Sequence, residues 1–332
     1  RHCTRTGWES SRALHDEPDI LADDLDLSDR VFLVTGANAG VGREVASFLA
    51  TRGATVFMVC RSRGRAEAAR AEILAKSPAA RVHLLEADVG LESDVRRCWR
   101  EFAAQASSDP PRLDGVVCNA GALLHRKTMT SEGVEATFAT HLLFGVYLLG
   151  SLAMPSLEST AGSRLVVVSS GGMYNFAFPS WGVATSTSWF TWYDGQCAYA
   201  YSKRGQVLLC ERWAAEHPRV KVVSCHPGWT DTAGVDSAYG RAKVLLQPLR
   251  SPWEGAEGIA WLCVAPADEL QSGAFYLDRA VQPKHMPGMV GAEGSVTMNS
   301  PESVDEMMLN LQAWSSGSRV TMGLPGAGRR AP

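Results

Sequence analysis

Tyr199 and Lys203 stand four residues apart in the run Tyr-Ala-Tyr-Ser-Lys, which has the pattern of a helix. Residues at that spacing share one helix face, so the lysine ammonium can stabilise a nearby phenolate and lower the pKa of the tyrosine. Tyr199 could then donate or accept a proton near neutral pH. Tyr201 competes for this role, but it does not lie one turn from Lys203. The same spacing also occurs on solvated helix faces, so the interpretation depends on the rest of the chain.

A glycine-rich loop lies between a strand pattern and a helical pattern. Gly36, Gly40 and Gly42 follow the apolar run at 31–34 and precede apolar residues at helical spacing. Glycines in this position let the backbone approach a pyrophosphate at the helix N-terminus. The spacing Gly-x-x-x-Gly-x-Gly differs from the common Gly-x-Gly-x-x-Gly, and a glycine turn without a ligand is the alternative.

Arginines follow the second strand pattern. Arg61 comes directly after the apolar run at 55–60, with Arg63 and Arg65 close behind. An acidic residue at this point would receive a ribose hydroxyl, whereas an arginine accepts a 2′-phosphate. The sequence therefore favours NADP(H) as the cofactor, with surface arginines on a solvated turn as the alternative.

Strand and helix patterns alternate along most of the chain. Expected strands cover 31–34, 55–60, 82–87, 115–118, 165–168, 220–225 and 274–277, and a later helix opens with the capping box at 251–254. This alternation predicts an α/β fold, a doubly wound parallel sheet of the Rossmann type in three α/β/α layers. We expect a polar, loosely packed N-terminal lead-in over 1–28, a single Rossmann-type domain over 29–282, and a C-terminal extension over 283–332, partly disordered with one short helix near 301–314.

The composition excludes several classes of function. A net charge of −3 with 45% hydrophobic residues leaves no electrostatic footprint for nucleic acid, so a small molecule is the expected partner. The apolar run at 142–154 is short and broken by glycines, which favours a buried helix and no transmembrane segment. The eight cysteines are scattered without metal-ligand spacing. We therefore expect no metal site and a cytoplasmic or other reducing compartment, with no targeting signal visible.

Several motifs together resemble a known family. Thr35-Gly36-x-x-x-Gly40-x-Gly42, Asp88-Val89, Asn119-Ala120-Gly121, Ser169-Ser170, Tyr199-x-x-x-Lys203 and Pro227-Gly228 stand in the order found in the short-chain dehydrogenases/reductases. The resemblance covers about residues 30 to 280. The stretches at 169–173, 193–195, 211–214 and 226–232 are similar to the dehydrogenase/reductase family member 12 subgroup.

This resemblance implies roles for individual residues. Tyr199 would exchange a proton with the substrate oxygen, Lys203 would lower its pKa and hold the nicotinamide ribose, and Ser170 would polarise the carbonyl, with Ser169 as the alternative. Asp88 and Val89 would contact the adenine. The implied cofactor-binding set is Gly36, Asn38, Gly40, Val41, Gly42, Arg61, Asp88, Val89, Asn119, Ala120, Gly121, Tyr199, Lys203, Pro227, Gly228 and Thr232.

The chain departs from the family at one position. The family places an asparagine on the long helix after Asn-Ala-Gly, where it binds a water of the proton relay, whereas this chain has His141 there. An imidazole can serve a relay. The helix is about one residue longer than the family pattern, so Leu142 could occupy the position instead, and a neutral histidine packed at the helix start is a further alternative.

A long insert separates Ser170 from Tyr199. Its aromatic residues are Tyr174, Phe176, Phe178, Trp181, Trp189, Phe190, Trp192 and Tyr193. They could line a lid over a lipophilic substrate or anchor a rigid loop. Trp229 and Trp253 could extend the same wall.

These observations predict an NADP(H)-dependent carbonyl reductase or alcohol dehydrogenase that acts on a bulky apolar substrate. The alternative from another class is a non-catalytic dinucleotide-sensing regulatory or scaffold protein, and an epimerase or dehydratase is the alternative within catalysis. The resemblance also implies that the two long helices could form the subunit interface of a homo-oligomer, as they do in many members of the family.

Overall fold

A computed structural model describes residues 3–15, 19–22, 24–106, 108–185, 193–286 and 296–316, apart from the side chains at 233, 237, 238 and 242. Its centre is an eight-stranded sheet in the order β3-β2-β1-β4-β5-β6-β7-β8, parallel except for β8, which pairs antiparallel with β7. The predicted doubly wound α/β fold is confirmed. The strands are β1 (Val31–Thr35), β2 (Thr55–Cys60), β3 (Arg81–Glu86), β4 (Gly115–Cys118), β5 (Arg164–Val168), β6 (Lys221–Cys225), β7 (Phe275–Leu277) and β8 (Ala280–Gln282).

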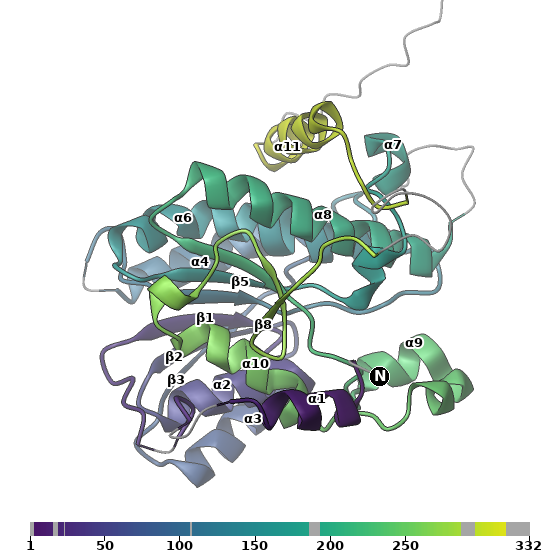
Figure 1. The fold of residues 1–332 in the computed structure, drawn as a ribbon. Helices are drawn as coiled ribbons and strands as arrows, with labels where there is room; N and C mark the ends of the chain where they lie inside the picture. The colour runs from purple at the N-terminus through teal and green to yellow at the C-terminus, as the bar shows by residue number, and fades with distance from the viewer. Residues whose placement is uncertain are drawn as a thin grey trace, which may run out of the picture.

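Helices cover both faces of the sheet (Figure 1). One face carries α4 (Glu92–Ala104), α5 (Ala136–Phe138), the π-helix η1 (Ala139–Leu148), α6 (Leu149–Ser159) and α8 (Gly195–Glu216), and the other carries α2 (Gly40–Thr51), α3 (Arg63–Lys76) and α10 (Pro252–Val264). Each face has its own core of buried apolar side chains. Strands buried on both faces are continuous apolar runs in the sequence, which is why their positions could be predicted closely.

The expected capping box is present at α10. The Ser251 hydroxyl accepts a hydrogen bond from the Glu254 backbone N–H at 3.2 Å, and the Glu254 carboxylate accepts one from the Ser251 N–H at 2.7 Å. The remaining elements are the shorter α1 (Arg5–Arg12), η2 (Gly171–Tyr174), α7 (Trp181–Ala184), α9 (Ala233–Tyr239), η3 (Gly240–Leu246) and η4 (Ala267–Glu269), and the C-terminal helix α11 (Pro301–Ser315).

The N-terminal lead-in is better ordered than the sequence indicates. Residues 5–12 form helix α1, which lies along α10 (Figure 1). None of its residues is buried, so apolar packing does not hold it. Ion pairs with α10 do, including Arg5 with Glu254 at 2.9 Å and Arg12 with Glu257 at 3.8 Å. The prediction of a loosely packed segment is corrected for these residues, because their polar composition supplies partners for charges on the domain.

The C-terminal extension contributes to the core of the domain. Its predicted helix is α11, and Met307 and Leu311 of α11 are buried in the same core as η1 and α6. Asp305 also pairs with Arg212 on α8. α11 lies over the long helical stretch of η1 and α6 and over the long helix α8 (Figure 1). An oligomer formed through this face of the domain would therefore include α11 in its interface.

The longest apolar helical stretch runs from residue 136 to 159. By length and composition alone it could cross a membrane, yet 78% of its most apolar window is buried inside the fold. The buried core helix expected from the run at 142–154 is therefore confirmed.

We expect Leu311→Ala to lower the free energy of unfolding by about 2–4 kcal/mol, because a fully buried leucine would be replaced by a cavity. Leu309→Ala is the matched control, since Leu309 lies on the same helix and is 66% exposed. Chemical denaturation monitored by circular dichroism measures both. Equal, small effects would show that α11 is not docked on the core.

Candidate active site

A cavity of about 480 Å³ lies at the carboxyl edge of the sheet. The residues that follow each of the strands β1 to β6 contribute to its lining, as parallel strands require at such an edge. All the residues predicted from the sequence for the catalytic and cofactor sites line this one cavity. Within the described part of the chain, no group of three or more His, Cys, Asp or Glu side chains could hold a metal ion.

The glycine loop is packed against the end of β4. Gly36 has φ +65°, and a Cβ there would lie 2.9 Å from the Ala120 Cα. At Gly42 a Cβ would lie 2.3 Å from the Asn119 side-chain nitrogen, which donates to the Thr35 carbonyl at 3.0 Å. The Thr35 hydroxyl in turn accepts hydrogen bonds from the N–H groups of Asn119 and Ala120, both at 2.9 Å. Asn119 and Thr35 therefore hold the loop in place, and only glycine fits at the contact.

Tyr199 and Ser170 both line the cavity, where the Ser170 side chain lowers the pKa of the tyrosine. Ser170 is the N-cap of η2, where its hydroxyl accepts from the Gly172 N–H at 3.2 Å. The Ser169 hydroxyl instead donates to the Lys203 backbone carbonyl at 2.9 Å and is buried. Of the two serines, Ser170 is the one placed to act together with Tyr199.

Lys203 is buried beneath Tyr199. Its Nζ lies 5.3 Å from the tyrosine ring centroid and donates to the Val168 carbonyl at 2.8 Å. Burial lowers the pKa of Lys203 to about 7. Burial also raises the pKa of Tyr199 to about 12, against the opposing effect of the Ser170 side chain. The expected lowering of the Tyr199 pKa by Lys203 is therefore not found in this structure, where burial is the largest effect on the tyrosine and the opposing effect comes from Ser170.

His141, rather than Leu142, faces the cavity. The His141 ring lies edge-on to the Tyr199 ring with centroids 5.2 Å apart, whereas Leu142 is buried in the core. The His141 Nε2 is 3.0 Å from the Ala122 carbonyl oxygen, and a Cβ on Gly121 would lie 2.0 Å from the His141 Cε1. Gly121 thus makes room for the imidazole.

The π-helix explains the uncertain register of this segment. In η1 the backbone spacing is wider than in an α-helix, which accommodates one additional residue. A Cβ on Gly145 would lie 2.0 Å from the Thr140 carbonyl oxygen, five residues earlier, so a glycine is needed there. Burial is the largest effect on His141 and the Lys203 charge the second, and together they lower the pKa of His141 to about 3. The imidazole is therefore neutral across the physiological range.

The arginines after β2 divide into two groups. Arg61 and Arg65 line the cavity, whereas Arg63 forms an ion pair with Glu67 on α3 at 3.4 Å. The Arg61 side chain is 72% exposed and lies 3.5 Å from the Asp88 carboxylate. An exposed pair of this kind contributes little stability, so Arg61 can exchange it for another anion at low cost.

The far wall of the cavity was largely missed by the sequence analysis. It includes Leu123, Leu124, Thr130, Trp229 and Tyr239, which come from loops and from α9. Only Trp229 was expected there. The others carry no motif, and only the fold brings them to the cavity.

The aromatic insert forms anchors in the part that the structure describes. Phe178 is buried, Trp181 packs edge-on against Phe138 and Trp314, and the Tyr193 hydroxyl contacts the buried Glu135 carboxylate at 3.1 Å. None of the described aromatics of the insert lines the cavity, and Trp189, Phe190 and Trp192 lie outside the described residues. Trp253 does not extend the wall either, because it stacks on Phe48.

A glycine loop, a buried lysine beneath a tyrosine, and a serine in the same cavity as that tyrosine define a nicotinamide-dependent oxidoreductase site on a Rossmann-type fold. The family described as short chain dehydrogenase matches residues 30–187. The chain belongs to the short-chain dehydrogenase/reductase family, whose members act on alcohol and carbonyl groups.

Two relatives and a solved structure are similar to most of this chain. "Dehydrogenase/reductase SDR family member 12" of Bos taurus is 38% identical over 291 residues, which cover 86% of this chain and 87% of that protein. Retinol dehydrogenase 14 of Mus musculus is 32% identical over 269 residues, covering 75% and 78%. A short chain dehydrogenase from Escherichia coli CFT073, complexed with NADPH, has the same fold with a TM-score of 0.62 and 24% identity, covering 78% of this chain and all of that one.

We expect His141→Leu to slow turnover by about tenfold or more if His141 relays the proton, and His141→Asn to stay closer to wild type, because asparagine keeps hydrogen-bonding capacity. The apparent pKa values of the pH-rate profile between pH 5 and 9 should be the same in all three proteins, because His141 is neutral throughout that range. Steady-state rates across pH measure both effects. Equal rates in wild type and His141→Leu would leave His141 a packing residue.

Proposed function

We propose that this protein is an NADP(H)-dependent carbonyl reductase or alcohol dehydrogenase with a bulky apolar substrate. The observation that carries the proposal is the meeting of Ser170, Tyr199 and Lys203 in the same cavity as the glycine loop. A dinucleotide-sensing regulatory or scaffold protein would need the loop alone. The catalytic reading accounts for the burial of a lysine without a carboxylate partner among the described residues, which a sensor does not require.

In this proposal the chain supplies proton transfer and orientation. Tyr199 gives a proton to the substrate oxygen during reduction and takes one during oxidation, and Ser170 donates a hydrogen bond to the same oxygen. Lys203 stabilises the phenolate that forms, and His141 connects this group to the proton supply. When bound, the nicotinamide cofactor supplies or accepts the hydride.

The cavity fits a dinucleotide from the glycine loop to the turn at Pro227. Gly36, Gly40 and Gly42 would hold the pyrophosphate at the N-terminus of α2. Asp88 and Val89 would contact the adenine, and Thr232 would hold the nicotinamide end. The preference for NADP(H) rests on Arg61 and Arg65, whose guanidinium groups can bind a 2′-phosphate beside α3.

The substrate class follows from the far wall. Leu123, Leu124, Trp229, Val235 and Tyr239 bring apolar and aromatic side chains to the cavity. The relatives named for retinol, an apolar alcohol, support the same class of substrate.

All eight cysteines are unpaired, which supports a reducing compartment for the protein.

We expect Tyr199→Phe to reduce turnover by at least about a hundredfold while NADPH binding remains, because the variant lacks only the proton-transferring hydroxyl. Tyr201→Phe is the matched control on the same helix, since Tyr201 packs on Phe176 and does not line the cavity. The assay is NADPH oxidation against a panel of apolar aldehydes and ketones, with product analysis. Binding without turnover in wild type would support the sensor, and product formed without net cofactor consumption would indicate an epimerase or dehydratase.

For the cofactor, we expect Arg61→Asp to weaken NADPH binding by about tenfold or more and to leave NADH binding nearly unchanged, because only NADPH carries the 2′-phosphate. Arg63→Asp is the control, since Arg63 is similarly exposed, pairs with Glu67 and does not line the cavity. Fluorescence titration with both cofactors measures the dissociation constants. An unchanged preference in Arg61→Asp would contradict the NADP(H) assignment.

A further inference from the structure

The turn that follows β6 forms one wall of the cavity and rests on a single buried arginine. Pro227, Gly228 and Trp229 line the cavity, and the Arg250 guanidinium lies directly behind Gly228. Gly228 has φ +72°, and a Cβ there would lie 2.3 Å from the Arg250 Nε. The contact is so close that the position of the arginine determines the position of the turn.

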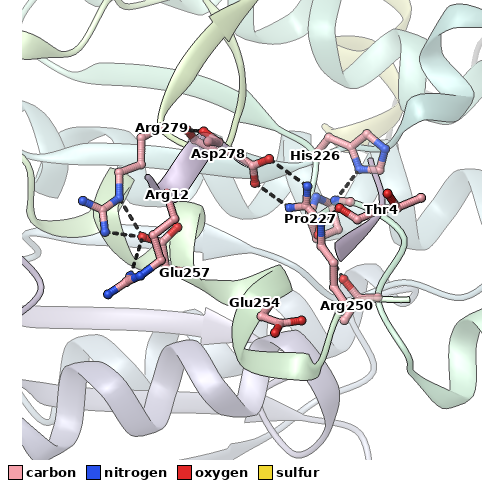
Figure 2. Close-up of polar contacts among 12 residues, drawn as sticks. Thr4, Arg12, His226, Pro227, Arg250, Glu254, Glu257, Asp278 and Arg279 are labelled. Carbon is pink, nitrogen blue, oxygen red and sulfur yellow. Dashed lines mark hydrogen bonds and ion pairs between the residues drawn. The ribbon is translucent and has the colours of Figure 1, made fainter. Parts of the chain in front are cut away.

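Backbone hydrogen bonds join the same two segments. The Arg250 N–H donates to the Trp229 carbonyl at 2.8 Å, and the Asp231 N–H donates to the Arg250 carbonyl at 2.8 Å. His226 supports the turn from the other side, because its Nδ1 accepts a hydrogen bond from the Gly228 N–H at 2.9 Å (Figure 2). Arg250 is therefore coupled to the turn by both its backbone and its side chain.

Asp278 holds the Arg250 side chain. The two form a bidentate ion pair, with the Nη2–Oδ2 distance 2.7 Å, and both side chains are buried (Figure 2). A buried ion pair is weak evidence for stability, because desolvation offsets the attraction between the charges. The pair does fix the orientation of the Arg250 side chain, since a planar guanidinium can donate two hydrogen bonds to one carboxylate in only a few orientations.

The backbone at Asp278 is strained. Asp278 and Arg279 form the two-residue turn between β7 and β8, with φ 51° and 65°, where glycine and asparagine are preferred. Strain of this kind persists where the surroundings impose it and is found near functional sites. Here each residue of the turn uses its side chain: Asp278 binds Arg250, and Arg279 binds Glu257 and Asp19.

The N-terminal segment contacts both the turn after β6 and the Arg250–Asp278 ion pair. The Thr4 carbonyl accepts a hydrogen bond from the Arg250 Nε at 3.3 Å, and the Cys3 carbonyl accepts one from the Trp229 N–H at 2.6 Å. The Ser11 hydroxyl of α1 donates to the Asp278 carbonyl at 3.2 Å. Both the cavity turn and its supporting pair thus contact a segment that lies far away in the sequence.

We propose that Arg250 and Asp278 are positioning residues of the active site, which hold the turn Pro227-Gly228-Trp229 in the geometry that binds the cofactor. The inference rests on the proposed function, because the turn matters only if the cavity binds the dinucleotide. Neither residue lines the cavity, so both act through the turn. The residues that carry this role lie in the β7–β8 turn and before α10, outside every motif of the family resemblance.

The test compares two variants of the same strained turn. Asp278→Asn keeps the size and the tolerance for positive φ but removes the charge that holds Arg250. Arg279→Gln breaks an ion pair of similar burial that does not touch the cavity turn. Both variants should unfold at a lower temperature than wild type, so stability alone does not distinguish them.

We expect Asp278→Asn to raise the dissociation constant for NADPH about fivefold or more, and Arg279→Gln to leave it at the wild-type value. Hydrogen exchange measured by mass spectrometry on the full chain gives a second readout. The N–H groups of Gly228 and Trp229 should exchange faster in Asp278→Asn and at the wild-type rate in Arg279→Gln. Arg250→Lys keeps the charge and loses the guanidinium fork, so its NADPH dissociation constant and its exchange rates should lie between those of wild type and Asp278→Asn. If Asp278→Asn does not fold, Arg250→Lys takes its place in the comparison.

Wild-type NADPH affinity and unchanged exchange in Asp278→Asn would overturn the inference, as would equal losses in Arg279→Gln. If the wild-type protein does not bind NADPH, the proposed cofactor is wrong. The exchange rates of Gly228 and Trp229 still decide whether the ion pair holds the turn, so the two failures are distinguishable.

Discussion

The parallel pairing of β1 with β2 on one side and β4 on the other is the constraint on which the site depends. The strand order reverses at this point, so the loops after β1 and β4 leave the sheet on opposite faces and open a crevice between them. The glycine loop enters the crevice after β1, and Asn119 after β4 closes against it. The other loops that line the cavity follow strands parallel to β1. Because parallel strands end at the same edge of the sheet, these loops all face the same cavity.

The site buries an ionisable side chain at the expense of stability. Lys203 donates to one backbone carbonyl, and no described carboxylate pairs with it, although a buried ammonium is costly. The surrounding fold compensates with two extensive apolar cores, one on each face of the sheet. Local arrangements that oppose stability are expected where a residue serves chemistry rather than folding.

Some parts of this structure could be predicted from the sequence because their causes are local. The doubly buried strands appear as apolar runs, and α10 announces its start with a capping box. Other parts depend on contacts between distant residues. Helix α1 has no buried face and is held by ion pairs to the domain, and β8 follows a turn of Asp278 and Arg279 that contains no glycine. The place of His141 depends on a π-helix, whose spacing differs from that of the α-helix assumed in sequence patterns.

The pKa values of Tyr199 and Lys203 shift in opposite directions from the same cause. Burial disfavours the phenolate of Tyr199 and the ammonium of Lys203, so each group alone is held toward its neutral form. A charge on one of them, however, stabilises the opposite charge on the other across a short distance of low dielectric. In this structure, however, the group that favours the Tyr199 phenolate against burial is Ser170, whose side chain lowers the pKa of the tyrosine.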